Sequence, residues 1–377
     1  MRHVRCPVAA AASNQLHRRL LAMIRQNLLQ QTTAPGAGDI LARCRALVQP
    51  ALLTAMERLH PQLQQMAGFS FGWCDQHGTP ETRAGTSGKG IRQALAVLSA
   101  EAAGGSAEMA LPGAVAVELV HAFSLVHDDI MDGDEKRRHR ATLWKAYGVG
   151  PALLAGDALL GLAVETVVNV CGEHALEAVR YLAAAITDLA CGQAQDLDFE
   201  DRPWTGANAV AVDEYQAMAD QKTGALLRCA AAIGAVLTGG PPPVIRALAV
   251  MGLYLGRAFQ AVDDLLGICG DPSITGKPIY SDLRRGKKTL PILAAINSGT
   301  SPGHRLGELL NSHQPLDENL FPLAAALIEE AGGLCRARQE SQRNLTCALR
   351  ILDNAPIANS ATKELAAIAT FLDKRAR

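Results

Sequence analysis

Aromatic residues are scarce in this sequence. They make up only 4% of its 377 residues, whereas hydrophobic residues together reach 49%. Strands favour aromatic and β-branched side chains, but here alanine and leucine, two strong helix formers, dominate the apolar set. This composition predicts packed helices rather than sheets, and the chain is long enough to bury one large core.

Several signals of other protein classes are also missing. The nine cysteines include no Cys-x-x-Cys pair, which argues against a zinc site or a disulfide framework and for a reducing compartment. The net charge of −1 provides no overall field that would recruit nucleic acid. No uninterrupted apolar run reaches the ~18–20 residues that span a bilayer. We therefore expect a cytoplasmic protein without a membrane span.

The first 38 residues contain no acidic residue and carry five arginines. A basic amphipathic stretch of this kind is typical of organelle transit peptides, but the signature is loose. We therefore favour a disordered N-terminal extension, ending in a Pro- and Gly-containing linker at 32–38. Residues 39–377 are expected to form a single all-helical domain.

Three carboxylates close an apolar helical run at residues 118–132. Asp128 and Asp132 are four residues apart and so share one helix face, with Asp129 beside them. Such acids repel one another and resist burial unless a cation binds between them. Oxygen ligands at helical spacing suit Mg²⁺, which also takes waters and substrate phosphates. The alternative is a solvated acidic helix end.

A second apolar run, Val244 to Val262, again ends in paired acids, Asp263 and Asp264. Two apolar helices that each carry acids at one end can face each other across a cavity. That cavity would be apolar below and negatively charged at its mouth. It would suit a ligand with an oily tail and a polyanionic head bound through metal ions.

With these motifs in place, the chain resembles the trans-isoprenyl diphosphate synthase (polyprenyl synthase) family, over residues 40–291. The two acid pairs correspond to its two aspartate-rich motifs. The connecting landmarks are Gly88-Lys89, Arg137-Arg138, Gly192-Gln193, Lys222-Thr223-Gly224 and Gly276-Lys277. The resemblance implies one large helical bundle around a central apolar cavity (the isoprenoid synthase fold), acting as a homodimer. Its substrates would be isopentenyl diphosphate and an allylic diphosphate.

The resemblance also implies roles for individual residues. About three Mg²⁺ ions would be bound with the diphosphate by Asp128, Asp129, Asp132, Asp263 and Asp264. The allylic diphosphate would be held by Arg137, Lys222, Thr223, Gln260 and Lys277, with Asp128, Asp132, Lys222 and Lys277 forming the catalytic set. Isopentenyl diphosphate would be held by Lys89, Arg92, His121 and Arg138. A positive charge on His121 would attract the diphosphate. The alternative is that His121 has a purely structural role.

Four positions depart from the family pattern. Gly90 and Gln93 replace an arginine and a proline, which weakens the isopentenyl diphosphate site without removing its main cations. His139 replaces a glycine, so we expect a different loop shape. Gly267 stands where the family has the third aspartate of the second motif. We expect Gly267→Asp to change the rate only modestly.

Two further residues have more than one interpretation. Gly224 lies inside a helix predicted over 213–237, where glycine costs ~1 kcal/mol against alanine. This indicates a kink or a close approach of a ligand. Asp196 either holds a metal-bound water, orders a lysine or simply ends a helix.

Phe123 lies five residues before the first motif, or ~7.5 Å along the helix. By resemblance such an aromatic residue forms the floor of the product tunnel in geranylgeranyl diphosphate synthases. We expect a twenty-carbon product, with fifteen carbons as the nearest alternative. Two rival functions are a terpene cyclase of the same fold, which would not need the isopentenyl diphosphate cations, and a non-catalytic partner subunit of a prenyl synthase.

Overall fold

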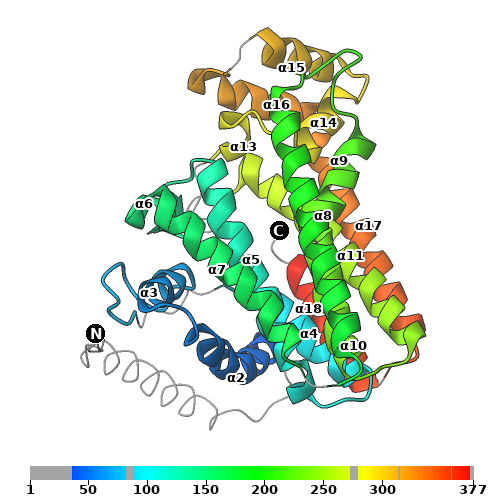
Figure 1. Cartoon of the computed structure of the whole chain (residues 1–377). Helices are drawn as coiled ribbons and strands as arrows, with labels where there is room; N and C mark the ends of the chain where they lie inside the picture. The colour runs from blue at the N-terminus through cyan, green and yellow to red at the C-terminus, as the bar shows by residue number, and fades with distance from the viewer. Residues whose placement is uncertain are drawn as a thin grey trace.

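The fold is known from a computed structural model, which describes residues 36–81, 88–170, 172–271, 279–312, 315–357 and 359–373. It is almost entirely helical, as predicted (Figure 1). Its first half contains α2 (Ala37–Met56), α3 (Pro61–Ser70), α4 (Ile91–Ala102), η1 (Ala107–Ala110), α5 (Leu111–Met131), α6 (Leu143–Tyr147), α7 (Val149–Val168) and α8 (Ala175–Asp201). Its second half contains α9 (Val212–Ala219), η2 (Asp220–Gly224), α10 (Ala225–Leu237), α11 (Pro242–Cys269), α13 (Ser281–Arg284), α14 (Leu290–Ile296), α15 (Ser301–Ser312), η3 (Glu318–Leu320), α16 (Phe321–Glu330), α17 (Gly333–Asn354) and α18 (Asn359–Asp373).

The main core joins the two motif-bearing helices. α5 packs on α4 and α7, while α10 lies against α4, α8 and α11, and α17 runs along α11. Figure 1 shows α8, α11 and α17 as long neighbouring helices. The core consists largely of fully buried alanine, leucine and valine, which allows the helices to pack closely. Both acidic helix ends are thus carried on rigid, buried supports.

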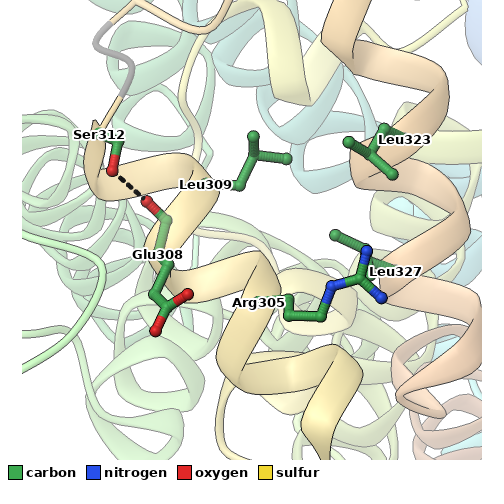
Figure 2. Close-up of a pocket in the computed structure, with 6 residues that line it drawn as sticks. All are labelled: Arg305, Glu308, Leu309, Ser312, Leu323 and Leu327. Atoms are coloured by element: carbon green, nitrogen blue, oxygen red, sulfur yellow. Dashed lines mark hydrogen bonds between the residues drawn. The ribbon is translucent and has the colours of Figure 1, made fainter.

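A second core gathers at one end of the bundle, where α13, α14, α15 and α16 lie together (Figure 1). A surface groove runs between α15 and α16. Figure 2 shows its six lining residues, Arg305, Glu308, Leu309, Ser312, Leu323 and Leu327. None of them belongs to the acidic motifs, so this groove is not the expected ligand cavity. The central apolar cavity stays a prediction.

The helix predicted over 213–237 is found as α9, η2 and α10, which together run from Val212 to Leu237. Near the start of the described chain, α2 ends at Met56 and α3 starts at Pro61, after His60, whose imidazole accepts a hydrogen bond from the Gln62 backbone N–H. The segment that carries Arg137 and Arg138 forms a two-stranded hairpin, β1 (Lys136–Arg137) with β2 (Arg140–Ala141). The predicted N-terminal extension lies almost wholly outside the described residues, and α2 begins at Ala37, inside the expected linker.

Three helices are long and apolar enough to cross a membrane, by length and composition alone: 107–131, α7 and α11. The 107–131 and α11 segments are the bundle's motif-bearing helices, with just over half of their most apolar window buried. α7 buries a smaller share and exposes Leu153, Leu154, Val164 and Val168. We expected no membrane span. The length and composition of these three helices do not support that expectation, which stays a prediction.

Candidate active site

The end of α5 presents three carboxylates in different electrostatic settings. Asp128 and Asp129 are both largely buried, and burial raises the pKa of each, to about 6 for Asp129. Arg137 opposes this by donating a 2.7 Å hydrogen bond to Asp129. Asp128 lies close enough to Lys222 and Arg137 for their charges to lower its pKa in part. The first motif thus meets cations from two other elements.

Asp132 is bound by two cations from the segment after α13. Arg285 donates to one oxygen at 2.7 Å and also pairs with Asp134, while Lys287 donates to the other oxygen at 3.2 Å. Burial alone would raise the pKa of Asp132, but Lys287 and Arg285 hold it below its usual range. Arg285 and Lys287 are neighbouring basic residues in the sequence. Their contact with Asp132, which lies about 150 residues earlier, could not be predicted from it.

Asp196 on α8 joins two lysines. It accepts hydrogen bonds from Lys222 at 2.6 Å and from Lys287 at 3.0 Å. Despite burial, these lysines keep the pKa of Asp196 below its usual range. Of its three interpretations, the geometry supports the one in which Asp196 orders a lysine.

Lys222 lies in a π-helical turn, Asp220–Gly224, between α9 and α10. Such turns are commonly found at functional sites. Gly224 ends the turn, and a side chain at Gly256 of α11 would place its Cβ 2.6 Å from the Gly224 Cα. The predicted irregularity at this glycine is confirmed, and the close approach is made by α11.

Behind Lys222, a hydrogen-bond chain runs into the second motif. Thr223 donates to Gln260 at 2.6 Å, and Gln260 donates to Asp264 at 2.8 Å. Asp264 also accepts from the Tyr215 hydroxyl and from the Leu290 backbone N–H. Its burial raises its pKa to about 6. These hydrogen bonds would also be present if Thr223, Gln260 and Asp264 only stabilised the packing of α11. Their roles in binding ligands therefore stay predictions.

The position of the missing third acid is filled from another element. A Cβ on Gly267 would overlap the Asp282 carboxylate of α13. The Ser281 hydroxyl lies 3.3 Å from the Gly267 carbonyl oxygen, so α13 is packed onto this turn of α11. Any side chain at position 267 would therefore require the Asp282 carboxylate to move, which the sequence pattern could not indicate.

A second group of cations surrounds the start of α4. Arg92 donates to His121 Nε2 at 3.1 Å, and its own Nε is buried without a hydrogen-bond partner among the described residues. Burial and the charges of Arg92 and Arg138 depress the pKa of His121 well below its usual range. The expected positive charge on His121 is therefore wrong: its Nε2 accepts a hydrogen bond, which requires a neutral ring.

Arg138 is brought to this group by the β1–β2 hairpin. Its guanidinium lies close to Gly88, where an added Cβ would come within 3.1 Å of Arg138 Nη1. Arg138 and His139 form the two-residue turn, with φ angles of 50° and 63°. These left-handed angles favour glycine, which is the residue the family has in place of His139. His139 therefore adopts a conformation that glycine favours, and the expected difference in loop shape from the family stays a prediction.

Lys89 and Phe123 each have an aromatic neighbour. The Lys89 ammonium lies 4.9 Å from the centre of the Phe371 ring of α18, a contact the sequence did not indicate. The Phe123 ring is half-buried and lies 4.6 Å from the ring of His127. Lys277 lies outside the described residues.

The described residues contain no group of three acidic, histidine or cysteine side chains that could hold a metal ion alone. Mg²⁺ does not require one, because it is usually bound by one or two carboxylates together with phosphate oxygens and waters. The oxygen-only donors Asp128 and Asp132, one helical turn apart, fit that description. Asp263 would supply the same kind of donor from α11.

Comparison with known proteins identifies the family of the chain. A family model described as polyprenyl synthetase matches residues 81–326. The chain is 42% identical over 339 residues to a (2E,6E)-farnesyl diphosphate synthase of Mycobacterium tuberculosis, covering 89% of this chain and 92% of that protein. It is 41% identical over 317 residues to a geranylgeranyl diphosphate synthase of the same species, covering 84% and 89%.

Among solved structures, a polyprenyl synthetase from Streptomyces coelicolor superposes with a TM-score of 0.81 at 46% identity. The match covers 88% of this chain and 98% of that one. The family model spans more than half of the chain, and the relatives cover most of its length. The chain therefore belongs to the polyprenyl synthetase family, has the isoprenoid synthase fold, and is a prenyltransferase of the short-chain trans-isoprenyl diphosphate synthase type.

Proposed function

We propose that the chain condenses isopentenyl diphosphate with an allylic diphosphate in a Mg²⁺-dependent reaction, yielding a short trans-prenyl diphosphate. The observation that carries this proposal is the presence of two separate cation groups beside α5. One contains Arg92 and Arg138 near α4; the other contains Lys222 and Lys287 near α8. Two diphosphate heads need two such groups.

The allylic diphosphate is the leaving group in this proposal. Mg²⁺, bound with that diphosphate at Asp128, Asp132 and Asp263, would supply Lewis-acid stabilisation of the developing charge. Lys222 and Lys287 are already ordered by Asp196, so they are positioned before the C–O bond breaks. Such preorganised charge is the main source of electrostatic stabilisation in enzymes. Arg137 and Lys277 complete the proposed set.

Isopentenyl diphosphate is bound by Lys89, Arg92, Arg138 and neutral His121 in this proposal. The buried, unpartnered Nε of Arg92 supports it, since an unsatisfied donor costs ~1–3 kcal/mol until an acceptor such as a phosphate oxygen arrives. The double bond of the bound substrate attacks the allylic cation. A proton is then lost, and the departing diphosphate is the proposed base.

The two rival functions are less well supported. A terpene cyclase would have no use for the Arg92 and Arg138 group. A non-catalytic partner subunit would not need the ordered lysines at Asp196.

Purified protein should be incubated with Mg²⁺, isopentenyl diphosphate and each allylic primer, with products identified by chain length. We expect elongated prenyl diphosphates that disappear when isopentenyl diphosphate or Mg²⁺ is omitted. Asp128→Asn or Asp132→Asn should lower turnover by several orders of magnitude. Asp157→Asn, at an exposed carboxylate of α7, is the matched control and should remain active. Cyclic products made without isopentenyl diphosphate would overturn the proposal.

We further propose a mainly twenty-carbon product, with Phe123 as the tunnel floor. The relatives named above include one synthase for the fifteen-carbon and one for the twenty-carbon product, so the length rests on Phe123 itself. Phe123→Ala should open the floor and lengthen the products, measured by chromatography of the dephosphorylated alcohols. An unchanged product length in an active mutant would reject Phe123 as the floor.

We also propose that the enzyme is a cytoplasmic homodimer that neither binds nucleic acid nor spans a membrane. The dimer is supported by the apolar outer face of α7, where Leu154, Val164 and Val168 are exposed. A second copy covering this face would bury one of the chain's apolar helices.

A further inference from the structure

Beyond the residues with proposed substrate contacts, Arg45 on α2 makes a contact that no sequence motif indicates. Its Nη2 donates a hydrogen bond to the backbone carbonyl of Gly88. Gly88 directly precedes Lys89 and also lies against the Arg138 guanidinium. A side chain from a distant helix thus holds the backbone at the point where the proposed isopentenyl diphosphate cations converge.

The segment from Gly88 to Gln93 has little internal support of its own. Gly90, the N-cap of α4, has φ +69° and provides no side-chain cap. The third residue of α4, Gln93, instead donates its backbone N–H to the Glu118 carboxylate of α5 at 3.0 Å. The segment is therefore held from two sides, by Arg45 before Lys89 and by Glu118 after Arg92.

Glu118 also interacts electrostatically with the arginines around this segment. Glu118 lies close enough to Arg45, Arg92 and Arg138 for all three to lower the pKa that its burial raises. A carboxylate surrounded by arginines can keep them in place while the site is empty of substrate. Arg45 itself is half-buried. Its Nη2 donates to the Gly88 carbonyl, while its Nε is buried without a hydrogen-bond partner among the described residues. Its hydrogen bond with this segment is the one to the Gly88 carbonyl, so its effect on a ligand would pass through the turn.

We propose that Arg45 is a positioning residue for isopentenyl diphosphate, acting through the Gly88 carbonyl to fix the turn that carries Lys89 and opens α4. This inference rests on the proposed function, in which Lys89 and Arg92 bind that substrate. Misplacing a binding group by about 1 Å can cost ~100-fold in enzymes. A lost hydrogen bond from a charged donor should cost about tenfold in affinity.

The test compares Arg45→Ala with Arg43→Ala, which lies two residues earlier on the same helix. Arg43 pairs with Glu101 and Glu364, away from the turn. We expect Arg45→Ala to raise the KM for isopentenyl diphosphate about tenfold while the KM for the allylic primer stays within about twofold. Arg43→Ala should leave both constants within about twofold. Titration calorimetry with isopentenyl diphosphate alone should show the same weakening for Arg45→Ala only.

Two further variants separate positioning from other roles. Arg45→Lys keeps a charged donor and should recover most of the lost affinity. In a Lys89→Ala background, Arg45→Ala should cost much less than in the wild type, because coupled residues are not additive. Fully additive losses would overturn the inference, as would an equal rise in both KM values, which would indicate general loss of structure.

The failure of this inference is distinguishable from failure of the proposed function. If the wild type does not bind or consume isopentenyl diphosphate, the proposed function itself is wrong. If the wild type is active and Lys89→Ala raises the KM but Arg45→Ala does not, only the positioning role of Arg45 is rejected.

Discussion

At the scale of single residues, three largely buried carboxylates of the site are each bound by basic side chains. Asp129 is bound by Arg137, Asp132 by Arg285 and Lys287, and Asp196 by Lys222 and Lys287. Removing one partner of a buried pair leaves an uncompensated charge, which costs more than the pair itself contributes. Substitutions among these residues should therefore affect stability as well as activity.

The sequence predicts only a modest change in rate for Gly267→Asp, but the structure adds an effect on stability. The overlap of any Gly267 side chain with the Asp282 carboxylate adds a packing cost and a like-charge repulsion. We now expect Gly267→Asp to lower the free energy of unfolding by ~1–3 kcal/mol, measured by urea denaturation. The double mutant Gly267→Asp/Asp282→Gly should recover most of that loss. Equal stability of the single mutant and the wild type would contradict this packing argument.

Lys288 should make stability depend on pH. It is buried, donates to the Glu200 carbonyl at 2.8 Å and lies 4.3 Å from the Trp204 ring centre, yet burial lowers its pKa to about 8. Between about pH 8 and pH 10.5 the unfolded chain holds this proton more tightly, so the contribution of Lys288 to stability rises with pH. The total change is at most ~3 kcal/mol.

The comparison is made with Lys288→Met, which retains an apolar side chain against Trp204. Thermal unfolding at pH 7.5 to 10.5 should show that the wild type gains stability relative to this mutant as the pH rises. Parallel curves for the two proteins would mean that Lys288 does not titrate in this range.

At the scale of elements, two local distortions of the backbone position basic side chains in the site. The π-helical turn at Asp220–Gly224 presents Lys222 toward Asp196, and the β1–β2 hairpin presents Arg137 and Arg138. A left-handed conformation costs ~1–2 kcal/mol per residue for side chains other than glycine. Both distortions are retained because packing and charge partners around them compensate.

The hairpin turn gives a direct test of this cost. His139→Gly should raise the free energy of unfolding by about 1 kcal/mol, because glycine adopts the φ of 63° without strain. Lys136→Gly, at a strand position of the same hairpin, is the control and should lower it. A destabilised His139→Gly protein would show that the imidazole contributes more than the strain costs.

The approach of α11 to the π-helical turn gives a second test. Gly256→Ala would place a methyl group 2.6 Å from Gly224 Cα, so the backbones must separate. We expect the free energy of unfolding to fall by ~1–3 kcal/mol and the KM for the allylic substrate to rise as Lys222 shifts.

Gly161→Ala is the matched control for this change. Gly161 lies in α7 with no atom within 4 Å of its added Cβ, so alanine should stabilise the helix by ~0.5–1 kcal/mol. Equal effects of the two substitutions would show that the contact between α11 and the π-helical turn has no special role.

At the scale of the whole molecule, two cores hold the site between them. The main core carries α4, α5, α10 and most of α11, while the second core carries α13 and α14. The cations at 285–288 follow α13 and therefore reach Asp132 from the second core. The relative position of the two cores thus decides whether Asp132 of the first motif is paired.

The exposed face of α7 should be covered in solution. Leu154 is 64% exposed, and Val168 55%; an apolar face of this kind commonly marks an interface. Leu154→Asp should shift the protein from dimer to monomer in sedimentation velocity experiments. Leu323→Asp, at an exposed leucine of the α15–α16 groove, should leave the dimer intact. A monomeric wild type would contradict the proposed assembly.

The helical class, the two motif-bearing helices and their acidic ends could be predicted from the sequence alone, because these depend on composition and on spacing of three or four residues along one helix. The sequence also indicated the irregularity at Gly224, since a helical glycine carries a local cost. Four features could be learned from the folded molecule alone: the Arg92 hydrogen bond to His121 Nε2, the binding of Asp132 by Arg285 and Lys287, the Asp282 carboxylate beside Gly267, and the contact of Arg45 with Gly88. Each of these depends on burial or on contact between distant segments, and neither is specified by the local order of residues.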